Sequence, residues 1–168
     1  RLSGERDIAI GTPVAGRGDA ALDDVIGMFV NTLVLRTDVA LDSSFVGALE
    51  HVRETDLSAF GHADVPFERL VEALDPARSA ARHPLIQVML TVQNMEQTEL
   101  ELPGLHVRGL DLDIVTAKFD LQFTFTDNAD GTTRLDVTYA RDLYDEDTAR
   151  SFGTRLLRIL DTVAENYD

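Results

Sequence analysis

The order of apolar and polar residues in the first forty positions predicts two strands around a short helix. An apolar run at 8–10, followed by glycine and proline, predicts a buried strand over 7–12 that ends in a glycine-rich turn. After Asp19, which is a suitable N-cap, apolar residues recur every three to four positions over 22–29, and this spacing predicts one face of a helix. The apolar run at 33–35 then predicts a second strand.

Two further helices are expected before the middle of the chain. Ser44 is a candidate N-cap, and the apolar stripe that follows it to Phe60 predicts about four helical turns. Asp64, placed shortly before Pro66, predicts the start of a second helix, because proline loses no hydrogen bond in the first helical turn. The apolar residues expected to face the core from this second helix are Phe67, Leu70, Val71 and Leu74.

The second half of the chain has mainly the pattern of strands. The apolar run over 85–92 predicts a central strand, and alternation at 105/107, 119–125 and 135–139 predicts three more. The segment 127–131 has the Asn, Asp and Gly chemistry of a hairpin turn. Asp145 caps a closing amphipathic helix. The element order predicts an α/β fold, with one mixed β-sheet flanked by helices.

Composition narrows the class of protein. The 15 Lys+Arg and 30 Asp+Glu residues give a formal charge of −15, and the pI is about 4.5. Nucleic acid is therefore not an expected partner, because phosphate binding needs concentrated positive charge. Cysteine is absent, which excludes disulfides and thiolate chemistry. Without a membrane-length apolar run or a leader segment, we expect a soluble, cytoplasmic protein with no membrane partner.

Common catalytic motifs are missing. No serine lies in a G-x-S-x-G elbow. Gly11 and Gly16 have P-loop spacing, but Arg17 and Gly18 follow where a P-loop needs Lys and then Ser or Thr. The residues themselves therefore show neither a hydrolase nor a nucleotide site.

Metal binding has no clear signal either. The histidines at 51, 62, 83 and 106 are scattered, and we interpret them as structural. His62 with Asp64 could form a metal or acid/base pair, although Asp64 is also wanted as the helix cap. Asp127 and Asp130 lack EF-hand spacing and are interpreted as turn residues. No metal site and no cofactor bound by this chain are expected.

Four stretches, in this order and spacing, resemble core motifs of nonribosomal peptide synthetase condensation domains: IGTPVAGR at 10–17, GMFVNTLVLR at 27–36, HADVPFE at 62–68 and RSAARHPL at 78–85. Further support lies in QVML at 87–90, in AKFDL at 117–121 and in 139–144. One departure is Ala63, where many members of the family carry Gln. The resemblance spans essentially the whole chain.

The resemblance implies a domain of two chloramphenicol-acetyltransferase-like lobes, with a paired-histidine motif ending in Asp-Gly in the N-terminal lobe. No two histidines are adjacent here. We therefore expect residues 1–168 to be the C-terminal lobe, with the N-terminal lobe absent, no catalytic residue in this chain and no activity of the fragment alone.

The implied reaction joins a carrier-bound donor acyl or peptidyl thioester to a carrier-bound acceptor amine. The substrates ride on phosphopantetheine of partner carrier domains, and the C-terminal lobe supplies a tunnel wall, a floor loop and a latch. The implied partners are the N-terminal lobe, donor and acceptor peptidyl carrier domains and a neighbouring adenylation domain.

Three residues are candidates for the tunnel or the lobe interface. Arg17 could pair with the aspartate of the absent histidine motif, or could be a turn-end surface cation. Asn94 could line the tunnel or simply form a turn, and Asn31 is also placed to satisfy backbone groups at its turn. Two alternative functions stay open: a catalytically inactive condensation-like module that recruits a tailoring enzyme, and a lobe of an epimerization domain, which the AKFDL segment at 117–121 disfavours.

Overall fold

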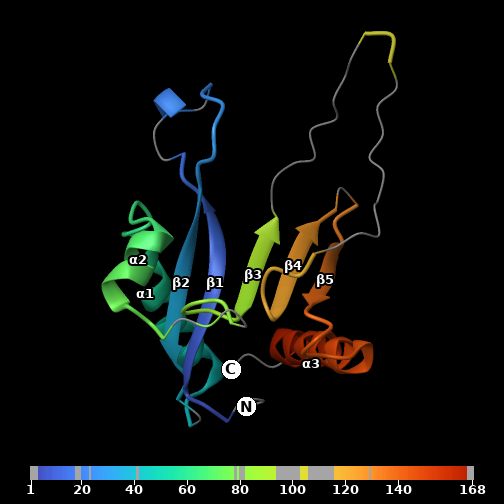
Figure 1. Ribbon diagram of the computed structural model, residues 1–168. Helices are drawn as coiled ribbons and strands as arrows, with labels where there is room; N and C mark the ends of the chain where they lie inside the picture. The colour runs from blue at the N-terminus through green and yellow to red at the C-terminus, as the bar shows by residue number, and fades with distance from the viewer. Residues whose placement is uncertain are drawn as a thin grey trace.

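The structure is a computed structural model that describes residues 4–17, 20–22, 24–40, 42–77, 79, 82–93, 103–105, 116–128 and 130–165. Its centre is a five-stranded sheet with the order β2-β1-β3-β4-β5 (Figure 1). The β1/β2 and β4/β5 pairs are antiparallel, whereas β1/β3 and β3/β4 are parallel. The expected mixed sheet is therefore confirmed. The strands are β1 (Asp7–Ala15), β2 (Val30–Asp38), β3 (Val88–Gln93), β4 (Leu121–Asp127) and β5 (Thr133–Tyr139).

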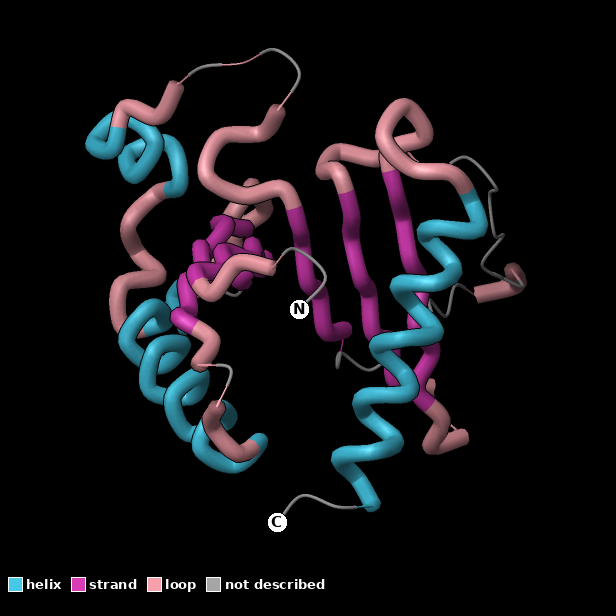
Figure 2. Tube along the Cα trace, turned by 90° about the horizontal axis from the view of Figure 1, so that it is seen from below, coloured by secondary structure: helices cyan, strands magenta, loops and turns pink. Residues whose placement is uncertain are grey.

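The α-helices lie at the two ends of the strand order. Helices α1 and α2 contact β2, and α3 contacts β5 (Figure 2). The helix bounds are Ala20–Leu22 for the short 3-10 helix η1, Phe45–Phe60 for α1, Phe67–Leu74 for α2 and Glu146–Glu165 for α3. No helix in the described part of the chain is long and apolar enough to cross a membrane.

The core is small and centred on β3. Ile86, just before β3, is fully buried, and Met89 on β3 is buried as well. Gly11 on β1 faces both side chains, and a Cβ at this position would lie 2.3 Å from Ile86 Cδ1. The backbone of β1 can approach β3 closely because Gly11 has no side chain. In the described part of the chain, the other buried hydrophobic residues are Leu33, Leu121 and Ala149.

The predicted end of the first strand is wrong. Strand β1 continues through Gly11 and Pro13 to Ala15, in unbroken register with β2. On its other side β1 pairs with β3 only at Gly11↔Met89, so that side of β1 is a free edge at Pro13. A proline that faces a free edge gives up no ladder hydrogen bond.

The helix expected over 22–29 is also wrong. Among the described residues of this segment only η1 is helical, and residues 24–29 form an irregular connection with a turn at Asp24 and a bend at Gly27. Ile26 is fully exposed and Met28 is 90% exposed. The spacing of the apolar residues was helical, but this segment projects beyond the end of the sheet and has no core to pack against (Figure 1).

Of the helix caps predicted at residues that the structure describes, two are confirmed and one is wrong. Ser44 Oγ accepts from Gly47 N at 3.1 Å, and Asp145 Oδ1 accepts from Thr148 N at 2.7 Å, so both caps are confirmed. Asp64 does not cap α2, because the N-cap position is Pro66 and no side chain of that residue bonds to the helix.

The hairpin turn is confirmed by Gly131, which has a φ of 82°. Of the strand predicted at 105/107, Leu105 is described and exposed, whereas Val107 lies outside the described residues.

Candidate functional site

The candidate site is one edge of the sheet. Strands β1, β3 and β4 are parallel, so their carboxyl ends, Ala15, Gln93 and Asp127, meet at the same edge. Strand β2 is antiparallel to β1 and begins at this edge with Val30. Ligands of open α/β sheets bind beyond the carboxyl ends of parallel strands, which makes this the edge of interest.

Two of the three sequence-predicted residues lie at this carboxyl edge. Arg17 comes two residues after the end of β1, and Asn31 is the second residue of β2. Asn94 follows Gln93 in the sequence but lies outside the described residues. Gln93 itself is anchored, since its side-chain oxygen accepts a hydrogen bond from the buried Thr126 on β4 at 3.3 Å.

Asn31 joins β2 to the start of α2. Its side-chain NH₂ donates to the carbonyls of Ala63 at 3.0 Å and Val65 at 2.8 Å. Its side-chain oxygen accepts from the N–H of Thr32 at 2.9 Å and from that of Phe67 at 3.1 Å. The bond from Phe67 satisfies a backbone N–H in the first turn of α2, which is the capping role that the sequence predicted for Asp64. Asn31 therefore does satisfy backbone groups, but on a neighbouring element as well as its own.

The side chain of Arg17 contacts the connection between β1 and β2, to which Arg17 itself belongs. Its guanidinium donates through Nη1 to the carbonyl of Leu22 and through Nη2 to that of Val25, the latter at 2.7 Å. The same group lies over the ring of Phe29, 4.3 Å from the ring centroid, in a cation–π contact. Sequence reasoning missed Phe29. No local pattern reveals it, because Phe29 comes opposite Gly16, next to Arg17, only when β1 and β2 pair.

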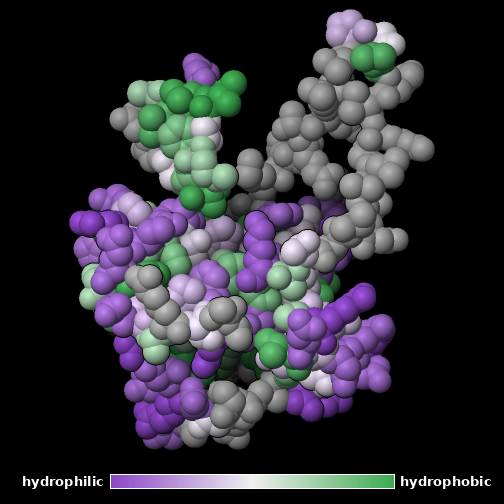
Figure 3. All heavy atoms as spheres, viewed as in Figure 1, coloured by the Kyte–Doolittle hydropathy of each residue, from purple (hydrophilic) through white to green (hydrophobic). Residues whose placement is uncertain are grey.

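The connection between β1 and β2 carries an exposed apolar surface. We call the described residues 16–17, 20–22 and 24–29 the β1–β2 arm. Figure 3 shows apolar surface gathered on the projecting part of the molecule over this arm. Val25, Ile26 and Met28 of the arm are all exposed, and so is Val30 at the start of β2. An exposed apolar patch of this kind is typical of an interaction surface.

Helix α1 is also apolar on a face that nothing in the described chain covers. It packs on β2, yet Phe45, Leu49, Leu57 and Phe60 are exposed. Asp56 lies among them with one carboxylate oxygen, Oδ1, buried and without a hydrogen bond, and burial raises the pKa of this carboxyl. The pKa rises because desolvation disfavours the charged form of the carboxyl.

The described histidines make no catalytic arrangement. His83 packs between the rings of Phe67 and Phe119, with centroid distances of 5.5 and 4.7 Å, and its Nδ1 lies 3.0 Å from the carbonyl of Pro84. This is the structural role expected for it. His62 and Asp64 are both exposed, and the described chain holds no group of three or more potential metal ligands. His106 lies outside the described residues.

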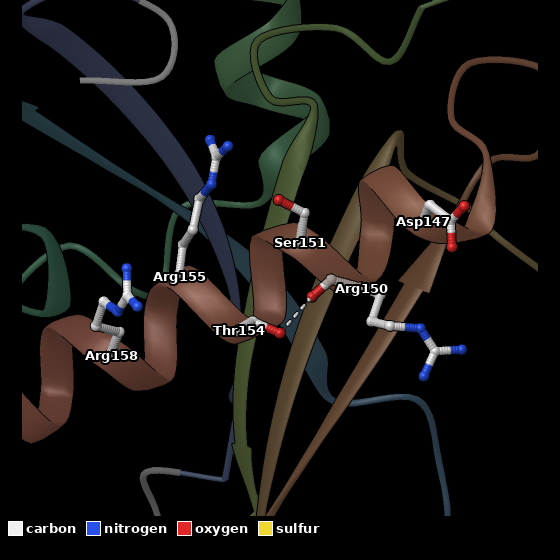
Figure 4. A pocket seen from close by; sticks show the side chains of 6 residues that line it. All are labelled: Asp147, Arg150, Ser151, Thr154, Arg155 and Arg158. Atoms are coloured by element: carbon white, nitrogen blue, oxygen red, sulfur yellow. Dashed lines mark hydrogen bonds between the residues drawn. The ribbon is translucent and has the colours of Figure 1, made fainter.

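Charged clusters away from the carboxyl edge are exposed. Arg36 pairs with Asp7 across β1 and β2 at 2.6 Å and lowers the pKa of that carboxyl, and Arg6 pairs with Asp38 at 3.2 Å. A shallow hollow on α3 is lined entirely by residues of that helix, and Figure 4 shows their side chains pointing in different directions. These are solvated surfaces. The hollow is lined by Asp147, Arg150, Ser151, Thr154, Arg155 and Arg158.

Comparison with solved structures gives the same fold. The X-domain from teicoplanin biosynthesis matches with a TM-score of 0.89 and 34% identity, over 97% of this chain and 38% of that chain. A four-domain nonribosomal peptide synthetase, AB3403, matches with a TM-score of 0.89 over 98% of this chain and 14% of that one; its 23% identity supports the fold alone.

Sequence relatives identify the family. The chain is 48% identical to a probable non-canonical nonribosomal peptide synthetase, CymA, of Salinispora arenicola, over 95% of this chain and 2% of that protein. It is 45% identical to a dimodular nonribosomal peptide synthase of Bacillus subtilis, over 100% of this chain and 7% of that protein. The chain thus spans less than a tenth of these relatives. A family model described as Condensation domain matches residues 1–168. The chain belongs to the condensation domain family of nonribosomal peptide synthetases.

Proposed function

We propose that the chain is the C-terminal lobe of a condensation domain that forms an amide bond between two carrier-bound substrates. The observation that carries this proposal is the 45–48% identity to peptide synthetases over nearly the whole chain. The paired-histidine motif is not in this sequence. The catalytic groups would therefore come from a companion lobe.

In the proposed reaction, the acceptor amine nitrogen attacks the carbonyl carbon of the donor thioester. The C–N bond forms, the C–S bond breaks, the amine loses a proton, and the thiol of the donor's phosphopantetheine arm leaves. Holding amine and thioester together replaces a bimolecular encounter and can supply much of the rate. The phosphopantetheine arms belong to the carrier domains, so this chain needs no cofactor of its own.

In the proposed function, this chain contributes surfaces that shape the substrate tunnel. The carboxyl edge of β1, β3 and β4 would form one wall of the substrate tunnel, and the β1–β2 arm would form the floor loop. Asn31 supports this assignment because three of its hydrogen bonds, to the backbone of Ala63, Val65 and Phe67, fix the start of β2 against the first turn of α2 and the connection before it. Arg17 and Asn94 stay candidate residues of the tunnel or the lobe interface. The N-terminal lobe, the carrier domains and an adenylation domain would be the partners.

A chimera tests the proposal. The segment of the Bacillus subtilis synthase that aligns with this chain is replaced by residues 1–168, and amide formation is measured between loaded donor and acceptor carrier domains. We expect turnover in the chimera and none with the isolated 168-residue chain. Turnover by the pure isolated chain would contradict the two-lobe account. A folded chimera that loads normally but forms no amide would contradict the catalytic role.

A second candidate function is supported by one comparison. A solved complex of the X-domain and OxyB from teicoplanin biosynthesis matches this chain with a TM-score of 0.81 and 35% identity, over 96% of this chain and 36% of that one. We infer that a condensation-like module that recruits a tailoring enzyme is the alternative role. The sequence of the N-terminal lobe would distinguish the two roles, because an amide-forming domain needs both histidines of the paired motif and a recruiting module does not.

A further inference from the structure

The β1–β2 arm keeps a defined shape without a core beneath it. Ile26 is fully exposed and Met28 is 90% exposed, so neither side chain contributes burial that could hold the arm in place. Backbone carbonyls in such an irregular segment also need partners that regular secondary structure does not provide. Both needs are met at Arg17, whose guanidinium donates to the carbonyls of Leu22 and Val25.

The base of the arm is closed just beside Arg17. The N–H of Gly16 donates to the carbonyl of Phe29 at 2.8 Å, which extends the β1/β2 ladder one step beyond the pair Ala15↔Val30. A Cβ at position 16 would lie 2.2 Å from the carbonyl oxygen of Phe29, so only glycine fits there. This closure brings the ring of Phe29 under the guanidinium of Arg17, 4.3 Å from the ring centroid.

We propose that Arg17 is a positioning residue that, clamped between Phe29 and the carbonyls of Leu22 and Val25, holds the β1–β2 arm in its folded shape. The planar guanidinium suits this task, because it stacks on a ring while its edge donates to more than one oxygen. The arm then presents Ile26 and Met28 already in place. That these side chains meet a companion lobe rests on the proposed function, whereas the clamp itself does not.

The test measures amide hydrogen exchange in the 168-residue chain by NMR. The reporter is the amide of Val25, which donates to Leu22 at 3.1 Å inside the arm. We expect Arg17→Gln and Phe29→Leu each to speed its exchange by about tenfold or more, and Arg17→Lys to have an intermediate effect. Phe29→Trp keeps an aromatic face and should preserve protection. The amides of β4 should exchange unchanged in every variant.

Two features separate a clamp from a general loss of stability. The double variant Arg17→Gln/Phe29→Leu should exchange no faster than Arg17→Gln alone, because that change already removes the contact with Phe29. Arg36→Gln is the matched control, since Arg36 is a strand arginine whose ion pair with Asp7 lies at the far end of the same two strands. It should leave Val25 unchanged.

Fluorescence gives a second measurement. The chain has no tryptophan, so Phe29→Trp introduces a single emitter. Adding Arg17→Gln to this variant should shift its emission to the red as the ring becomes more hydrated. If Val25 exchange stays within twofold of the parent in both Arg17→Gln and Phe29→Leu, and the emission does not shift, the clamp is refuted. Loss of amide formation in the chimera with normal Val25 protection would instead contradict the proposed function.

Discussion

The side-chain oxygen of Asn31 accepts a hydrogen bond from the backbone N–H of Phe67 at 3.1 Å, although the two residues are 36 positions apart. The start of α2 is thus capped from a neighbouring strand. The same side chain also donates to the carbonyls of Ala63 and Val65. One residue therefore holds the α1–α2 connection, the first turn of α2 and the start of β2 together.

This arrangement predicts that Asn31 cannot be replaced by its acidic isostere. Asn31→Asp keeps the shape but has no N–H to donate, and it places a carboxylate against two carbonyl oxygens. We expect Asn31→Asp and Asn31→Ala each to lower the free energy of unfolding by roughly 2–4 kcal/mol, measured by urea denaturation. Asn128→Asp, in the β4–β5 turn, is the control: it loses one solvent-exposed hydrogen bond, from its side-chain NH₂ to Thr132 Oγ1, and should cost about 0.5 kcal/mol or less. Equal stability of Asn31→Asp and the parent would show that these bonds contribute nothing.

A larger side chain at Gly11 should lower the stability of the protein, because it would clash with one buried methyl group. Gly11→Ala places its Cβ 2.3 Å from Ile86 Cδ1, and Ile86 is fully buried. We expect a loss of roughly 1–3 kcal/mol. Ile86→Val removes that Cδ1, so the double variant should be more stable than the sum of the two single losses predicts. Strict additivity in thermal unfolding would rule out this contact as the cause.

Asp145 should make the stability of α3 depend on pH at the acidic end. Its hydrogen bonds with Thr148 lower the pKa of the carboxyl, the backbone bond being the main cause. A lowered pKa means that the stabilisation is present above the pKa of the unfolded chain, about 3.9. It is lost as the pH falls through the lower pKa of the folded chain. We expect Asp145→Ala to reduce Tm by about 3 °C at pH 7.

Asp145→Asn separates the cap from its charge. Asparagine accepts the same backbone hydrogen bond but does not titrate, so this variant should keep most of the parent Tm at pH 7. Its Tm should then fall less than that of the parent between pH 5 and pH 2. A parallel fall in both proteins would contradict the assignment of this pH dependence to Asp145.

The exposed apolar side chains of the β1–β2 arm should cause the isolated chain to self-associate. Ile26→Gln/Met28→Gln removes the two most exposed apolar side chains of the arm. We expect sedimentation velocity to show concentration-dependent association of the parent that this double variant reduces. Leu49→Gln/Leu57→Gln on α1 is the comparison, and an equal reduction there would place the contact on α1 as well. A parent that stays monomeric at all concentrations would contradict the prediction.

Local chemistry in the sequence determined much of the fold. The caps Ser44 and Asp145, the hairpin turn near Gly131 and the alternation over β4 and β5 were all predictable, because each depends on residues a few positions apart. The motif order also determined the family, which the comparisons confirm. For the candidate site, the sequence singled out Arg17 and Asn31, and both lie at the carboxyl edge of the sheet.

Only the tertiary structure decided what those two residues contact. Asn31 replaces Asp64 as the cap of α2 because β2 lies against that helix, which no local pattern reveals. The apolar spacing over 22–29 resembled a helix, but a helical stripe is stabilised by the surface it packs on, and the arm projects past the sheet. The role of Phe29 is equally invisible to local patterns. Its contact with Arg17 exists only once β1 and β2 pair and bring Gly16 opposite Phe29.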